Sequence, residues 1–119
     1  MDGLPVKIKR VYDPPAAADG QRVLIDRLWP RGMTREEAHL DAWLRDVAPS
    51  NDLRHWFGHD PARWDEFQER YRRELEDETH QAALAQLRER ARQGPLTLLF
   101  ATKDTEHNSA LVIREALEA

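Results

Sequence analysis

Three short apolar runs along the chain predict β-strands. In the first, residues 6–12, two apolar side chains alternate with two lysines, as expected for a strand with one buried face. The other runs, residues 23–29 and 96–101, are mostly apolar without alternation, which is typical of strands buried on both faces. Helical segments separate the second run from the third, and this order favours a small, mostly parallel sheet of about three strands flanked by helices. Because only about ten residues join the first two strands, those two could instead pair antiparallel.

The rest of the chain carries the spacing of amphipathic helices. Thr34 and Glu37 form a capping-box pattern, which predicts a short helix from there to about Leu40. Residue types that cap helices predict further helical segments beginning at Asp41, at Ser50, at the pair Asp60–Pro61 and at Thr79. Residue types that stop helices follow three of these segments, at Pro49, Gly58 and Gly94. A last helix is expected near the C-terminus.

Length and composition limit the class of protein. A chain of 119 residues has room for one hydrophobic core, so we expect a single α/β domain over residues 1–119. The absence of cysteine excludes disulfides, thiolate catalysis and zinc-finger sites. No apolar stretch approaches the roughly 20 residues of a membrane span, and the first residues lack the apolar region of a signal peptide. A cytoplasmic protein without a membrane partner is therefore expected.

Charge is distributed unevenly along the chain. The formal net charge is −4, yet residues 1–35 contribute +3 and the remainder contributes −7. A protein with this balance is not expected to bind polyanions over its whole surface. A local cluster of cations in the first third of the chain could still hold an anion.

Charged and aromatic side chains gather near the carboxyl end of each expected strand. They are Arg10 and Tyr12 for the first strand, Asp26, Arg27, Trp29 and Arg31 for the second, and Lys103 and Asp104 for the third. Ligands of open α/β sheets bind at this edge, where the following helix also presents its N-terminus. Several arginines, a lysine and a helix N-terminus suit a phosphate, a carboxylate or a nucleotide.

We therefore expect an anion-binding pocket at the carboxyl ends of the strands. Its expected cationic and polar contacts are Arg10, Arg27, Arg31, Lys103 and Asn108, and its expected walls are Tyr12, Trp29 and Trp56. If the protein is an enzyme, the acid–base candidates are Asp26, Lys103, Asp104 and His59. The sequence contains no nucleophile motif and no glycine loop of the kind that binds nucleotides.

Two features leave simpler interpretations open. Asp26 lies in an apolar run, so it could form a structural ion pair with Arg10 or Arg27 and take no part in binding. His55 and His59 have the four-residue spacing of metal ligands on one helix, but Gly58 lies between them and interrupts the helix. We therefore expect no metal site and no cofactor.

Several stretches of the sequence resemble a known family. Residues 8–13, 23–32, 48–50, 53–59 and 98–104 are similar to the YeaO-like branch of the bacterial domain-of-unknown-function family 488. The resemblance covers nearly the whole chain and implies a compact α/β protein of the bacterial cytoplasm, in a family without an assigned reaction. In the wider family a Cys-His-Arg element opens the final helix. Here Asn108 and Ser109 stand at that place, so the thiol is missing and Ser109 replaces the histidine of the YeaO-like pattern.

Three functions fit these observations. The first is a binder of, or an enzyme for, an anionic small molecule at the strand ends. The second is a nucleic-acid accessory protein whose arginines contact backbone phosphates, with binding that weakens steeply as salt rises. The third is a protein-interaction module without a ligand, in which the charged edge is a structural network.

Overall fold

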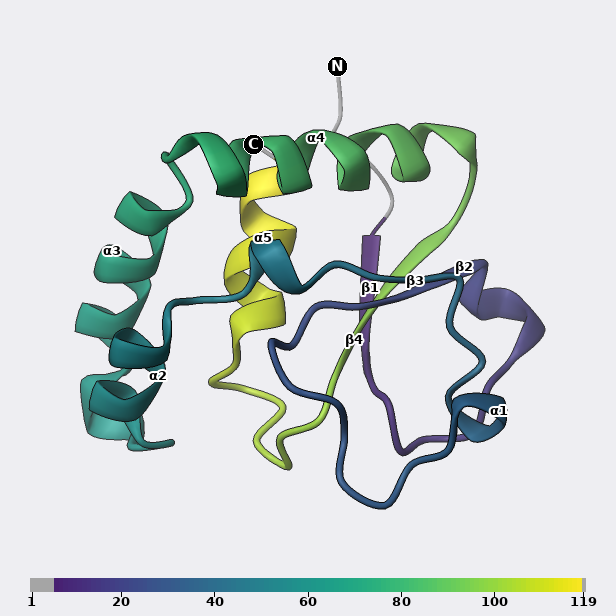
Figure 1. Ribbon diagram of the computed structural model, residues 1–119, viewed down its shortest axis with the longest axis horizontal. Helices are drawn as coiled ribbons and strands as arrows, with labels where there is room; N and C mark the ends of the chain where they lie inside the picture. Colours follow the sequence, from purple (N-terminus) through teal and green to yellow (C-terminus); the bar gives the residue numbers. More distant parts are fainter. Residues whose placement is uncertain (1–5, 119) are drawn as a thin grey trace.

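The computed structural model describes residues 6–118 and centres on a parallel sheet (Figure 1). Within those residues the sheet has four strands, in the spatial order β1 (Val6–Arg10), β4 (Leu96–Phe100), β2 (Gln21–Leu24) and β3 (Ala42–Trp43). All three neighbouring pairs are parallel. The expected α/β fold with a small, mostly parallel sheet is confirmed, with β3 as a short additional strand.

The first two strands do not pair with each other, because β4 lies between them. β4 pairs with β1 on one side and with β2 on the other. All five residues of β4 are buried, as its mostly apolar sequence without alternation indicates. An antiparallel pair of β1 and β2 is therefore wrong, since both strands run parallel to the strand that separates them.

Two strands end earlier than the apolar pattern predicts. β2 ends at Leu24 rather than near Trp29, and β1 ends at Arg10 rather than at Tyr12. The backbone N–H groups of Val11 and Ile25, which directly follow β1 and β2, still donate to β4. After these residues both segments leave the sheet. These departures place Tyr12 and the residues from Asp26 onward at the carboxyl edge of the sheet.

Two short helices lie where the capping residues predict them. α1 (Arg35–Ala38) starts with the expected capping box. α2 (Asn51–Phe57) follows Ser50, whose hydroxyl accepts a hydrogen bond from the backbone N–H of Leu53. Gly58 ends α2 in the left-handed conformation that glycine adopts without strain.

The segment that begins at Asp41 is not helical. The carboxylate of Asp41 accepts from the backbone N–H of Arg22, and the chain after it pairs with β2 as strand β3. A 3-10 turn, η2 (Arg45–Val47), follows. The helical expectation fails here because these backbone groups find partners across the sheet edge, which local spacing does not reveal.

Three longer helices complete the fold. Asp60 caps the 3-10 turn η3 (Pro61–Arg63), and α3 (Trp64–Glu74) follows directly. α4 (Glu78–Gln93) is capped by Asp77, two residues before the expected cap. α5 covers Ser109–Glu118.

The two faces of the sheet are covered differently (Figure 1). On one face, α3, α4 and α5 contribute their apolar side chains to the main hydrophobic core, together with strand residues such as Val23 and Leu98. On the other face, α1 and the loops after β1 and β2 cover a smaller cluster made of Val11, Leu24, Ala38 and Leu99. The sheet edge at the carboxyl ends of β1, β4 and β2 carries the loops that form the site described below.

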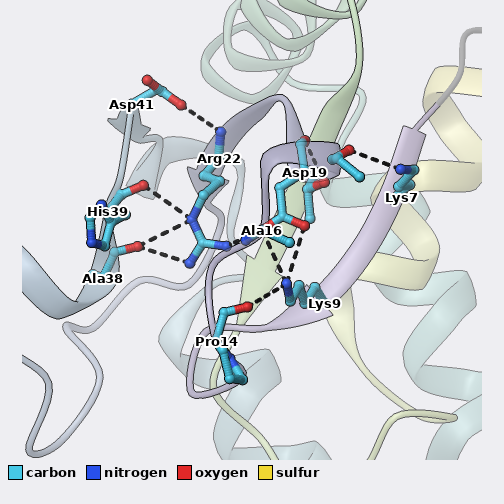
Figure 2. Close-up of polar contacts among 11 residues, drawn as sticks. Lys7, Lys9, Pro14, Ala16, Asp19, Arg22, Ala38, His39 and Asp41 are labelled. Carbon is cyan, nitrogen blue, oxygen red and sulfur yellow. Dashed lines mark hydrogen bonds and ion pairs between the residues drawn. The ribbon is translucent and has the colours of Figure 1, made fainter.

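A buried ion-pair network fixes the chain just before and within β2 (Figure 2). Nη1 of Arg22 lies 2.5 Å from Oδ2 of Asp19, and Nζ of Lys9 lies 3.1 Å from the same oxygen. The rest of the Arg22 guanidinium donates to the backbone carbonyls of Ala38 and His39. Burial alone would raise the pKa of Asp19, but the hydrogen bonds that its carboxylate accepts outweigh burial and lower that pKa. The network ties β1, β2 and the chain before β3 together.

Gly20→Ala is expected to lower the free energy of unfolding by about 3 kcal/mol, from left-handed strain and overpacking together. Gly20 has φ 64°, and an added Cβ would lie 2.2 Å from the backbone oxygen of Pro95. Gly32→Ala is the matched control, because Gly32 has φ 77° and nothing within 4 Å of its added Cβ. Urea unfolding of the two variants checks this, with a loss of about 1 kcal/mol expected for the control. Equal losses would contradict the close contact with Pro95.

Candidate functional site

A cleft of about 580 Å³ opens at the carboxyl edge of the sheet. Its walls come from segments that follow three strands: Tyr12 after β1, residues 26–31 after β2 and residues 100–102 at the end of β4. The lining also includes the C-terminal part of α2 and the two residues after it, and residues 107–109 around the start of α5. Further apolar surface comes from Ala48, Pro49 and, on α3, Phe67. The volume falls within the usual range of small-molecule sites, and the cleft lies at the edge where such sites form in α/β sheets.

Asp26 is held between the residue that follows β4 and the side chain of Trp43 in β3. Its Oδ2 accepts a hydrogen bond from the backbone N–H of Ala101 at 2.9 Å, and its backbone oxygen accepts from Nε1 of Trp43 at 2.6 Å. Burial raises the pKa of Asp26 to about 6, against the opposing effects of the Ala101 hydrogen bond and the charges of Arg54 and His59. Asp26 is thus a carboxyl group with a raised pKa in a cleft.

The structural ion pair considered for Asp26 does not form within residues 6–118. Arg10 instead donates to two backbone carbonyls just after β4, at 3.0 and 3.1 Å. Arg27 donates to the backbone carbonyl of Pro49 at 3.2 Å. Carbonyl oxygens fix the direction of both guanidiniums but leave their positive charges without a carboxylate partner in the described part of the chain.

The cleft carries an excess of positive charge. The basic side chains that line it are Arg27, Arg31, Arg54, His55, His59 and His107. Among its described lining residues, Asp26 is the only acid. With neutral histidines the lining has a formal charge of +2, in a protein whose net charge is −4. An anion is therefore the kind of group that this lining favours.

The outer rim of the cleft is partly aromatic. The Tyr12 hydroxyl donates to the backbone carbonyl of Arg31 at 2.7 Å, which fixes the loop after β2 against the loop after β1. Leu28 is 58% exposed, and the side chain of Arg31 is exposed as well. Trp29 lines the cleft and also packs against the smaller core cluster.

Four residues selected from the sequence lie outside the lining of the cleft. They are Arg10, Trp56, Lys103 and Asp104. The ring of Trp56 lies beneath the guanidiniums of Arg63 and Arg70, at 5.3 and 4.4 Å. Lys103 is exposed, and Arg10 is held by the carbonyls described above. The structure therefore gathers only part of the expected set.

Asp104 and Asn108 build the turn that leads into α5. Asp104 accepts from the backbone N–H of His107, and its Oδ2 lies 2.9 Å from Nδ1 of the same residue. The amide of Asn108 donates to the Asp104 carbonyl and accepts from the N–H of Leu111. Asn108 lines the cleft, but its amide oxygen and one amide N–H bond within the protein, and Asp104 acts on the cleft by orienting His107.

Arg54 and His107 are lining residues that the sequence analysis did not select for the site. The argument from strand ends covers only residues that follow a strand, whereas Arg54 lies on α2. No local pattern gives the direction in which α2 packs. His107 stands two residues before α5, so the expected helix N-terminus at this edge was a signal that could have identified it.

The described residues contain neither a cluster of metal ligands nor a membrane-spanning helix. Within residues 6–118, no group of three or more His, Cys, Asp or Glu side chains is placed to hold a metal ion. No helix in the same range is long and apolar enough to cross a membrane. His55 and His59 both line the cleft, one on α2 and the other beyond Gly58.

Comparison with known proteins gives one family and several full-length relatives. A family model described as "Inactive DUF488-N3 subclade" matches residues 5–119. The uncharacterized protein Rv3073c of Mycobacterium tuberculosis is 42% identical over 112 residues, which cover 94% of this chain and 92% of the relative. The uncharacterized protein YeaO of Escherichia coli is 40% identical over 114 residues, covering 96% and 97% respectively. No solved structure gives a significant match.

Proposed function

Because the chain belongs to the DUF488 family, within its inactive N3 subclade, we propose that the cleft binds a small anionic molecule without converting it. The anionic group is a phosphate or a carboxylate, alone or as part of a nucleotide. Asn108 and Ser109 line the cleft at the place where the wider family carries its Cys-His-Arg element. The missing thiol supports binding over catalysis. The setting proposed for this activity is the bacterial cytoplasm.

The observation that carries the proposal is the uncompensated positive charge of the cleft. Arg27, Arg31 and Arg54 line it without a carboxylate partner among residues 6–118, although acids outnumber bases in the whole chain. Gathering like charges in a recess costs folding free energy unless an anion offsets it. Arginine also presents a planar set of donors that matches the oxygens of phosphate and carboxylate.

The start of α5 supports the same ligand class. Residues 107–109 line the cleft, so the N-terminus of this ten-residue helix borders the same cleft as the arginines. Backbone N–H groups and the helix dipole make such an end favourable for an anion. Three kinds of donor, guanidinium, imidazole and helix N-terminus, therefore surround one recess.

Titration of the protein with inorganic phosphate in a calorimeter tests the proposal. Arg31→Ala is expected to weaken binding about tenfold, as for the loss of one hydrogen bond to a charged group. The free energy of unfolding of this variant should equal that of the wild type to within about 0.5 kcal/mol, because the Arg31 side chain is exposed. Arg92→Ala, which removes an exposed arginine outside the cleft, is the matched control and should leave binding unchanged.

Two results would contradict this proposal. One is the failure of the wild-type protein to bind phosphate. The other is an Arg31→Ala variant that loses stability but keeps its affinity, which is the outcome expected of a structural charge network without a ligand.

A further inference from the structure

Asp26 places a hydrogen-bond acceptor inside a cleft of cations. One of its carboxylate oxygens accepts from Ala101 N–H, whereas the other has no donor within residues 6–118. In that part of the chain no fully buried side-chain oxygen or nitrogen lacks a partner. The free oxygen of Asp26 is therefore reachable from the cleft, which Asp26 lines.

We propose that the cleft binds a phosphate ester that also carries a hydroxyl group, and that Asp26 accepts the hydrogen bond of this hydroxyl. Sugar phosphates and nucleotides share this chemistry. The inference rests on the proposed function, because the arginines hold the phosphate, and it adds the group that Asp26 recognises.

The charge of the cleft selects a neutral donor for Asp26. A carboxylate could equally accept from an ammonium group, as in a zwitterionic ligand. However, the same cleft is lined by Arg27, Arg31 and Arg54, whose positive charges would repel the ammonium group of such a ligand. A hydroxyl satisfies the free oxygen without adding positive charge, so the ligand carries one anionic group and at least one hydroxyl.

The size and rim of the cleft suit an organic phosphate. Its volume of about 580 Å³ exceeds what inorganic phosphate alone would fill and lies in the range of sites for larger ligands. Tyr12, Leu28 and Trp29 add apolar and aromatic surface to the lining. The carbon skeleton of a sugar or a nucleoside would contact this surface while the phosphate remains with the arginines.

Calorimetry with two matched esters tests the inference at pH 8, where Asp26 is ionised. Glycerol 3-phosphate and n-propyl phosphate share a three-carbon chain and a phosphate and differ in two hydroxyls. The wild-type protein is expected to bind the hydroxylated ester about tenfold more tightly, as for one hydrogen bond to a charged acceptor. In Asp26→Asn this preference should fall to about threefold or less, while n-propyl phosphate binds at least as tightly as before.

The outcomes separate this inference from the function on which it rests. If neither ester nor inorganic phosphate binds, the proposed function fails and the inference fails with it. Equal affinities for the two esters, or a preference that survives in Asp26→Asn, overturn the inference alone. Ribose 5-phosphate and AMP, compared in the same way, distinguish a sugar phosphate from a nucleotide by whether the base adds affinity.

Discussion

Asp26→Asn is expected to make the protein more stable at pH 8, by up to about 3 kcal/mol. The pKa of Asp26 is raised by burial to about 6, whereas an unfolded aspartate titrates near 3.8. Between these values the native state binds more protons than the unfolded state, so stability falls as pH rises through that window and stays lower above it. An asparagine removes the charge while its amide oxygen can still accept from Ala101 N–H. The variant therefore lacks the free-energy cost of carrying an ionised, buried carboxylate at this position.

The measurement is urea unfolding of the wild type and Asp26→Asn between pH 4 and pH 8. The difference in unfolding free energy should be small near pH 4 and should grow to its full size above about pH 6. Other titrating groups cancel in this difference, because the two proteins share them. A difference that does not depend on pH, or an asparagine variant that is less stable at pH 8, would show that Asp26 is not a destabilising charge.

Asp19→Ala is expected to lower the free energy of unfolding by about 3–5 kcal/mol, which is the cost of leaving a buried charge without its partner. Arg22 is only 4% exposed, and its guanidinium would keep the carbonyls of Ala38 and His39 but no carboxylate (Figure 2). Lys9 would lose the same partner. The loss is large against the 5–15 kcal/mol stability of an ordinary domain.

Chemical denaturation of Asp19→Ala and Glu89→Ala side by side checks this expectation. Glu89 pairs with Arg92 on an exposed stretch of α4, so its removal should cost less than about 1 kcal/mol. If Asp19→Ala loses no more stability than this control, the network before β2 contributes little and Arg22 finds other compensation.

The fold was predictable where local chemistry decides it. Thr34 and Ser50 are capping residues with their partners three positions away, and both helix starts lie where they indicate. The run from Leu96 to Phe100 is apolar except for Thr97 because both faces of that strand are buried, and the structure places it at an inner position of the sheet. The prediction that a helix begins at Asp41 was wrong, because the carboxylate of Asp41 accepts from the N–H of Arg22, which is distant in sequence.

The position of the cleft followed from sheet topology, whereas its full lining did not. Tyr12, Asp26, Arg27 and Arg31 follow strands, and parallel strands bring such residues to one edge. Arg10 also stands at a strand end, but carbonyls beyond β4 hold its guanidinium outside the lining. The packing of α2, which brings in Arg54, depends on tertiary contacts that no spacing in the sequence encodes.

Diffraction from crystals soaked in selenate tests the central claim most directly, because selenium scatters anomalously and marks the position of a phosphate-like anion. The account predicts an anomalous peak in the cleft, within hydrogen-bond distance of at least one of Arg27, Arg31 and Arg54, and its loss when an excess of phosphate competes. An empty cleft beside selenate bound elsewhere on the surface would contradict it.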